Sequence, residues 1–195
     1  MENILYLDEY INYYDKKYGK IINFKPYKKT LKNGIIIDSK KFLKSFEKLK
    51  KAYKIANALL NEKLILIINS NYSIDDKNKI KDLLEELNYK QIEIINEITF
   101  LKINKNNLYI NYNESYFNIY YLDNEKVKLI NYENNNVNKS LVINILKKIN
   151  KENIIILGKN YQELINIFKK TNCNYYFYEE SDNLFIKIYL KNKSV

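Results

Sequence analysis

Residues 3–25 read NILYLDEYINYYDKKYGKIINFK and predict three consecutive β-strands. Apolar residues in this segment alternate with polar ones or run together, as in strands with one or both faces buried. Breaks near Glu9 and at Tyr18-Gly19 separate the strands NILYLDEY, INYYDKKY and KIINFK. Such an opening predicts an antiparallel meander at one side of a sheet.

The remainder of the first half alternates helix and strand. Ser39 as N-cap and apolar residues at helical spacing predict a helix over 42–59. A second helix is predicted to begin at Ser73 or Asp75 as its cap and to carry Ile80, Leu83, Leu84 and Leu87 at helical spacing. The apolar run Leu64 to Ile68 predicts a buried strand, and Gln91 to Glu97 is read as another strand. Strands that follow helices in this way imply parallel pairing at the centre of the sheet.

The second half repeats this order and predicts an internal duplication. Its expected strands are Asn107 to Tyr112, Ser115 to Leu122, Lys126 to Tyr132, 153–157 and 174–178, its expected helices are 141–149 and 161–168, and 184–190 is read as one more strand. We therefore expect an α/β protein of two βββαβαβ half-domains, 1–103 and 104–195, facing each other across a cleft.

The composition is that of a globular, cytoplasmic protein. Hydrophobic residues make up 46% of the 195 residues, and only three glycines and one proline occur, so long flexible linkers are not expected. The apolar runs are too short for a transmembrane segment, and the N-terminus has no signal-peptide pattern. Cys173 is the single cysteine, so no internal disulfide can form.

The net charge of +10 makes nucleic acid a candidate partner, but the absence of arginine argues against sequence-specific recognition. All 33 cations are lysine, and arginine, the usual bidentate reader of guanine and phosphate, is absent. Histidine is absent as well, which excludes histidine acid–base catalysis, cysteine–histidine catalysis and typical zinc sites. Nine of the 20 tyrosines cluster in the two meanders: Tyr10, Tyr13, Tyr14 and Tyr18 in the first, and Tyr109, Tyr112, Tyr116, Tyr120 and Tyr121 in the second. Such clusters suit a protein interface, although a coding bias would also supply them.

Five short segments resemble parts of a known family. They are Ile4 to Asp8, Thr30 to Asp38, Leu64 to Ser70 with Ile92 to Glu97, Leu108 to Glu125, and Ile154 to Asn160. In this order they resemble the first phosphate loop, the stretch before the first long helix, the following strand and acidic segment, the second phosphate loop and the adenosine-binding segment of the actin-like ATPase superfamily, in its bacterial MreB, FtsA and PilM branches. The resemblance implies an actin-like (ribonuclease H-like) fold whose outer subdomains are absent, because the connections are short.

The residues of the implied nucleotide cleft depart from the family pattern. Tyr10 stands in place of a glycine of the first phosphate loop, Asn111 in place of an acid of the second, and Lys159 in place of a glycine after Gly158. These changes affect backbone approach to phosphates, organisation of Mg²⁺ and room for the base. The relic cleft implied by the resemblance comprises Asp8, Tyr10, Asn111, Asn113, Ser115, Gly158 and Lys159.

With these departures, the resemblance implies a non-catalytic scaffold, that is, a pseudo-ATPase. We expect no catalytic residues, no metal site and no cofactor; ATP with Mg²⁺ is the one ligand whose binding has to be tested. Its expected partner is a protein, such as the cytoplasmic segment of a membrane protein at a type IV pilus or secretion platform or at the cell-division or cell-shape machinery. The chain would then lie at the inner membrane face through that partner, and self-association is compatible with this role. A weak nucleotide-binding ATPase and a lysine-rich, non-specific nucleic-acid binder are the alternatives.

Overall fold

The chain forms two compact units in the computed structural model. The described residues are 2–55, 63–101, 103–112, 116–133, 139–149, 151–157, 165, 168, 174–177 and 184–193. Unit 1 comprises Met1–Phe100 and Phe185–Val195, and unit 2 comprises Leu101–Leu184.

Unit 1 is built on a five-stranded sheet with the order β3-β2-β1-β6-β7. Its strands are β1 (Asn3–Leu7), β2 (Ile11–Asp15), β3 (Lys20–Phe24), β6 (Lys63–Ile68) and β7 (Gln91–Asn96). The first three strands form an antiparallel meander, and β6 and β7 run parallel to β1. The predicted meander and the buried parallel strand β6 are confirmed, whereas β7 is parallel but lies at the edge of the sheet and is partly exposed.

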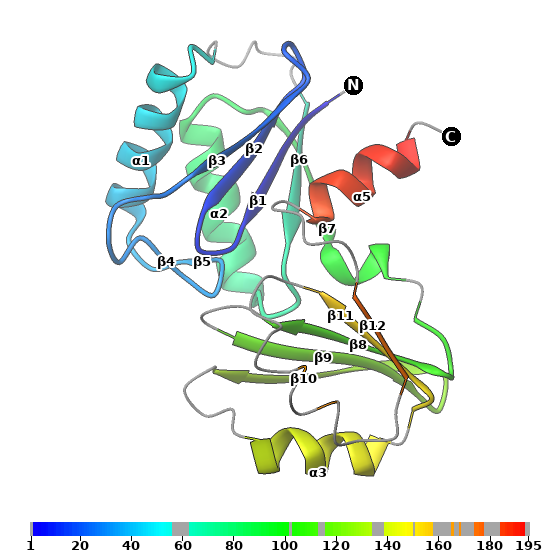
Figure 1. The fold of residues 1–195 in the computed structure, drawn as a ribbon. Coiled ribbons are helices and arrows are strands. Elements are labelled where there is room, and N and C mark those ends of the chain that lie inside the picture. The colour runs from blue at the N-terminus through cyan, green and yellow to red at the C-terminus, as the bar shows by residue number, and fades with distance from the viewer. Residues whose placement is uncertain are drawn as a thin grey trace. The chain divides into compact units, whose positions relative to one another are not determined.

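Two helices cover one face of this sheet, and a third covers the other (Figure 1). The helices are α1 (Ser39–Ala52), α2 (Ile74–Glu86) and α5 (Leu184–Lys193). The unit also contains the short helix η1 (Glu97–Phe100) after β7 and a hairpin of the strands β4 (Leu31–Lys32) and β5 (Ile35–Ile36) before α1. Leu5 and Leu7 of β1 point to α1 and α2, whereas Tyr6 points to α5, because successive strand residues face opposite sides.

The caps of the two first helices are set by short polar side chains. Ser73 caps α2 as predicted: its hydroxyl accepts the Asp76 N–H at 3.1 Å, and the Asp76 carboxylate accepts the Ser73 N–H at 3.0 Å. The expectation that Ser39 caps α1 is wrong by one residue. Asp38 is extended, and its carboxylate accepts the Lys41 N–H at 3.0 Å, so Asp38 is the N-cap and Ser39 the first helical residue. Helix α1 ends at Ala52, earlier than predicted, and 56–62 lie outside the described residues.

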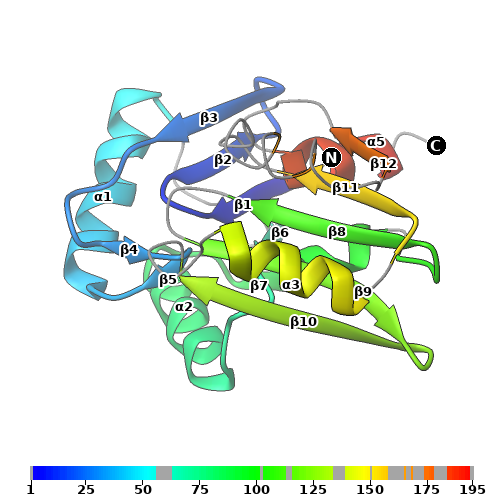
Figure 2. The ribbon, with the colours of Figure 1, turned by 60° about the horizontal axis from the view of Figure 1, so that its bottom comes forward.

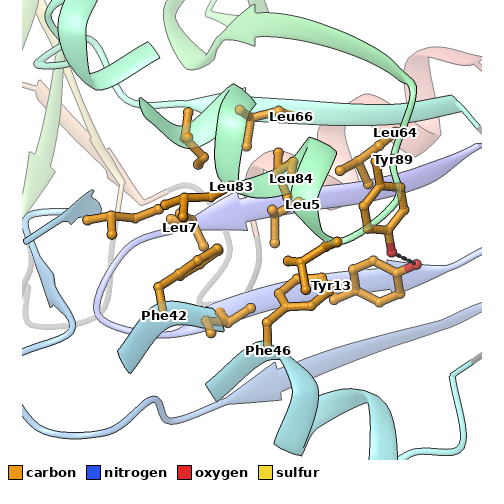
Figure 3. Close-up of a cluster of buried hydrophobic side chains, with 14 of the residues drawn as sticks. Leu5, Leu7, Tyr13, Phe42, Phe46, Leu64, Leu66, Leu83, Leu84 and Tyr89 are labelled. Carbon is orange, nitrogen blue, oxygen red and sulfur yellow. Dashed lines mark hydrogen bonds between the residues drawn. The ribbon is translucent and has the colours of Figure 1, made fainter. Parts of the chain in front are cut away.

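An aromatic cluster forms the centre of unit 1 (Figure 3). Phe42 and Phe46 of α1 are fully buried, and their ring centroids are 5.9 Å apart. The Phe46 ring meets the rings of Tyr13 and Tyr89 edge-on. The hydroxyls of Tyr13 and Tyr89 are hydrogen-bonded to each other at 3.1 Å, which satisfies two polar groups inside an apolar core.

Unit 2 repeats the sheet of unit 1. Its sheet order is β10-β9-β8-β11-β12, with an antiparallel meander followed by two parallel strands. The elements are β8 (Asn107–Tyr112), β9 (Tyr116–Asp123), β10 (Lys126–Glu133), α3 (Lys139–Ile149), β11 (Asn153–Leu157) and β12 (Asn174–Phe177). Helix α3 lies along one face of the sheet (Figure 2) and buries Val142, Ile145 and Leu146. The helix predicted over 161–168 lies outside the described residues apart from Ile165 and Phe168, which are helical.

The strand predicted over 184–190 is instead the helix α5, and it packs on unit 1. Phe185, Ile186 and Tyr189 are buried, a spacing that places them on one helical face. The Phe185 ring contacts that of Tyr6, and the Tyr189 ring contacts that of Phe100. Unit 2 therefore ends before the expected boundary at 195, because the last helix buries its apolar face against the first unit.

A glycine fixes the turn between β4 and β5 against the end of β1. Gly34 has φ +79°, and a Cβ at this position would lie 2.5 Å from the Leu7 carbonyl oxygen and 2.7 Å from Asn69 Nδ2. Gly19, in the turn between β2 and β3, has φ +61° but nothing within 4 Å of such a Cβ. The two glycines share a backbone conformation and differ in the space around them.

We expect Gly34→Ala to destabilise the protein much more than Gly19→Ala. Each change places an alanine in the left-handed region, at a cost of about 1 kcal/mol. Gly34→Ala also forces the turn away from Leu7, which costs about 1–3 kcal/mol more. Urea denaturation followed by circular dichroism measures both losses, and equal losses would show that the contact with Leu7 is unimportant.

Candidate functional site

The parallel strands of unit 1 end at one polar edge. Because β1, β6 and β7 run in the same direction, their carboxyl ends at Leu7, Ile68 and Asn96 lie together. Asp8 follows β1 and the fully buried Asn69 follows β6. In open α/β sheets this is the edge where ligands bind.

The loop after β1 is held by hydrogen bonds to the side chain of Asp8, its first residue. Asp8 Oδ1 accepts the Tyr10 N–H at 2.6 Å and the Asn12 Nδ2–H at 3.0 Å, and the Asp8 N–H donates to the Tyr10 carbonyl at 3.2 Å. These bonds form a local turn of the kind that aspartate side chains favour. The Tyr10 amide, which occupies the position predicted to approach a phosphate, is therefore bonded to a carboxylate.

Acceptor oxygens dominate the surroundings of this loop. Glu9 Oε1 and Asn12 Oδ1 are buried and have no hydrogen-bond partner within the described part of the chain. Together with the Asp8 carboxylate they give the loop negative and electron-rich atoms rather than N–H donors. A phosphate, by contrast, binds where several backbone N–H groups converge.

The turn between β4 and β5 is fastened to the same edge. Asn69 Nδ2 donates to the Asn33 carbonyl, and the Tyr72 hydroxyl donates to the Gly34 carbonyl at 2.6 Å. Burial, with the nearby Asp76 and Glu97 carboxylates, raises the pKa of Tyr72 well above its ordinary value, so this hydroxyl remains a donor. Asn69 and Tyr72 were not predicted as site residues; the signals in the sequence are the Asn33-Gly34 turn and an asparagine directly after a buried strand.

The corresponding edge of unit 2 is described only in part. Asn111, at the end of β8, is buried and paired with Asn118 of β9, as Tyr6 is paired with Asn12 in unit 1. Asn12 and Asn118 thus hold equivalent positions, and both are fully buried. Asn118 Oδ1 accepts from Asn131 Nδ2, and Asn118 Nδ2 donates to the Tyr120 hydroxyl at 3.2 Å.

The remaining predicted cleft residues lie outside the described residues: Asn113, Ser115, Gly158 and Lys159. Of the predicted set, the structure brings Asp8 and Tyr10 together in one loop and buries Asn111 in the other unit. Among the residues that the structure describes, no three acidic or cysteine side chains gather as a metal site. Within the same ranges, no helix is long and apolar enough to cross a membrane.

The chain matches no family model and no curated protein, but it matches solved structures. MreB5 of Spiroplasma citri bound to AMPPNP is 10% identical with a TM-score of 0.62, over 100% of this chain and 96% of that one. The MamK double helical filament is 10% identical with a TM-score of 0.66, over 100% and 99%. A Bacteroides thetaiotaomicron protein of unknown function with an actin-like ATPase fold is 11% identical with a TM-score of 0.57, over 97% and 96%.

These likenesses extend over nearly the whole chain and agree with the repeated strand order of the two sheets. The resemblance read from the sequence is confirmed at the level of the fold: the chain, at 195 residues, has the actin-like ATPase fold.

Proposed function

We propose that this chain is a non-catalytic actin-like scaffold that binds a protein partner. The observation that supports this most is the loop after β1, in which the Asp8 carboxylate accepts the Tyr10 amide. Phosphoryl transfer depends on donors and a metal ion positioned around the transferred phosphate. A loop that bonds its amide to its own acid, beside Glu9, lacks the donors and adds negative charge.

Exposed tyrosines on the surface of the chain also support the proposed scaffold role. Several tyrosines are about half exposed, and tyrosine is enriched at protein interfaces. We propose a membrane-associated assembly, as the FtsA and PilM branches of the resemblance imply, with the chain held at the membrane by its partner. Because MamK and AlfA have been solved as filaments, self-association is part of the same proposal.

Weak nucleotide binding is the second candidate. MreB5 and AlfA, whose structures resemble this one, were both solved with AMPPNP. Asp8 follows β1 and belongs to the relic cleft that the resemblance implies, so binding of a nucleotide without hydrolysis is the second proposal for this loop.

We expect no phosphate release above background from Mg²⁺-ATP, because the loop of Asp8 offers no converging donors. A phosphate-release assay should be run with the wild type, with Asp8→Ala and with the matched control Asp75→Ala, an exposed acid in the first turn of α2. Turnover that Asp8→Ala abolishes and Asp75→Ala preserves would contradict the proposal. Calorimetry with ATP and ADP is the companion measurement: micromolar binding without turnover would favour the second candidate.

A further inference from the structure

A groove with a volume of about 450 Å³ lies beside the strand β3 of unit 1. Residues of the turn between β2 and β3, of β3 itself and of the C-terminal end of α1 line it. Its volume falls within the range of about 300–1,000 Å³ typical of ligand pockets. The proposed function does not use this groove, which adjoins the opposite end of β2 from Asp8.

Strand β3 is the edge strand of its sheet. It pairs with β2 on one side, and no strand of the described residues pairs with its other side. The free side of an edge strand presents N–H and C=O groups that can pair with another extended segment. The groove therefore adjoins backbone that is able to accept one more strand.

Two tyrosines give the groove its apolar walls. Tyr18, from the turn before β3, is 51% exposed, and Tyr53, from the end of α1, is 48% exposed. Ile21 of β3 is partly exposed and adds aliphatic surface to the lining, while Ile22 is buried in the core. Tyrosine contributes to binding energy because its ring buries apolar area while its hydroxyl stays hydrated.

The charge around the groove is positive. Lys20 and Lys54 line the groove, and Lys17 lies beside it with its ammonium 5.1 Å from the centre of the Tyr18 ring. The one acidic lining residue, Asp15, is buried, and its carboxylate accepts the Lys17 N–H at 2.8 Å. With a net charge of +10, a second copy of the chain would bring further positive charge, so the complementary partner is acidic.

We propose that this groove binds an extended, acidic segment of a partner protein, which adds to the free edge of β3 as a further strand. Apolar residues of the segment pack against Tyr18 and Tyr53, and its acidic residues meet Lys20 and Lys54. The inference rests on the proposed scaffold role and specifies the partner segment: alternating acidic and apolar residues without proline.

The test is fluorescence polarisation with a labelled peptide of sequence Glu-Phe-Glu-Leu-Glu-Phe-Glu at physiological salt. We expect saturable binding that weakens at least tenfold in Tyr18→Ala/Tyr53→Ala and in Lys20→Glu/Lys54→Glu. The matched controls are Tyr176→Ala, an equally exposed tyrosine, and Lys128→Glu, an exposed lysine, both in unit 2. These controls should bind the peptide as the wild type does. All substituted groove residues except Lys20 lie outside the sheet, and circular dichroism checks that the variants fold.

Hydrogen exchange provides the second readout. Strand addition should slow amide exchange in β3, whereas simple charge attraction would not, and a peptide with proline at alternate positions should fail to compete. The proposal is overturned if the wild type does not bind, if the unit 2 controls weaken binding equally, or if β3 is not protected. A dimer that Tyr18→Ala/Tyr53→Ala dissociates would also overturn it and assign the groove to a second copy. None of these outcomes bears on ATP turnover, so the groove and the non-catalytic role fail separately.

Discussion

Phe46→Ala is expected to lower the free energy of unfolding by about 3–5 kcal/mol, the usual range for removing a buried phenylalanine ring. Phe46 is fully buried, and its ring lies 5.9 Å from that of Tyr13 and 6.3 Å from that of Tyr89, both edge-on. The change leaves a cavity and removes these aromatic contacts, each worth about 0.5–1.5 kcal/mol. It also loosens the support of the Tyr13–Tyr89 hydrogen bond.

Urea denaturation measures the free energy of unfolding of Phe46→Ala. Glu47→Ala is the matched control, because Glu47 is the next residue of α1 and is exposed. The control should change the free energy of unfolding by less than about 0.5 kcal/mol. Phe46→Leu should fall between the two because it refills part of the cavity. A loss below about 1 kcal/mol in Phe46→Ala would contradict the packing of α1 on this sheet.

Phe185→Ala is expected to destabilise unit 1 by a similar amount, about 3–5 kcal/mol. Phe185 is buried, and its ring centroid is 5.4 Å from that of Tyr6 in β1. Nearby, the Tyr189 hydroxyl donates to Glu2 at 2.9 Å, and burial together with this bond raises the pKa of Tyr189 above its ordinary value. Loss of the Phe185 ring therefore weakens the attachment of α5 to the start of the chain.

The comparison is with Lys187→Ala, because Lys187 lies on the same helix and is exposed. Hydrogen exchange should accelerate in β1 and β6 of the Phe185 variant and remain unchanged in the lysine variant. If both variants exchanged alike, α5 would not be part of unit 1.

The sequence predicted the sheets well because their signals are local. The meander of β1 to β3 and the cap at Ser73, which the sequence left open between Ser73 and Asp75, are each readable within a few residues. The repeated order follows from several such local signals in each half. Helix α5 was read as a strand because a short apolar segment such as Leu184 to Leu190 fits both periodicities, and only its packing partner distinguishes them. That partner, Tyr6, lies near the opposite end of the chain.

The part of the candidate site that could be predicted is the part formed by residues close together in the sequence. Asp8 and Tyr10 were identified together, but the closing of the loop by the Asp8 carboxylate is a matter of side-chain geometry. The bond from Tyr72 to the Gly34 carbonyl joins residues 38 positions apart, and no local pattern indicates it.

The return of α5 to unit 1 affects the order in which the protein can fold during synthesis. Tyr189 bonds to Glu2 across 187 positions, so the ribosome must make the whole of unit 2 before unit 1 receives its last helix. Domains usually fold in the order of their synthesis. Here the unit that emerges first is completed last, while unit 2 has its entire sequence available beforehand. Until then the surface around Tyr6 stays uncovered, and a nascent chain would need protection at that face.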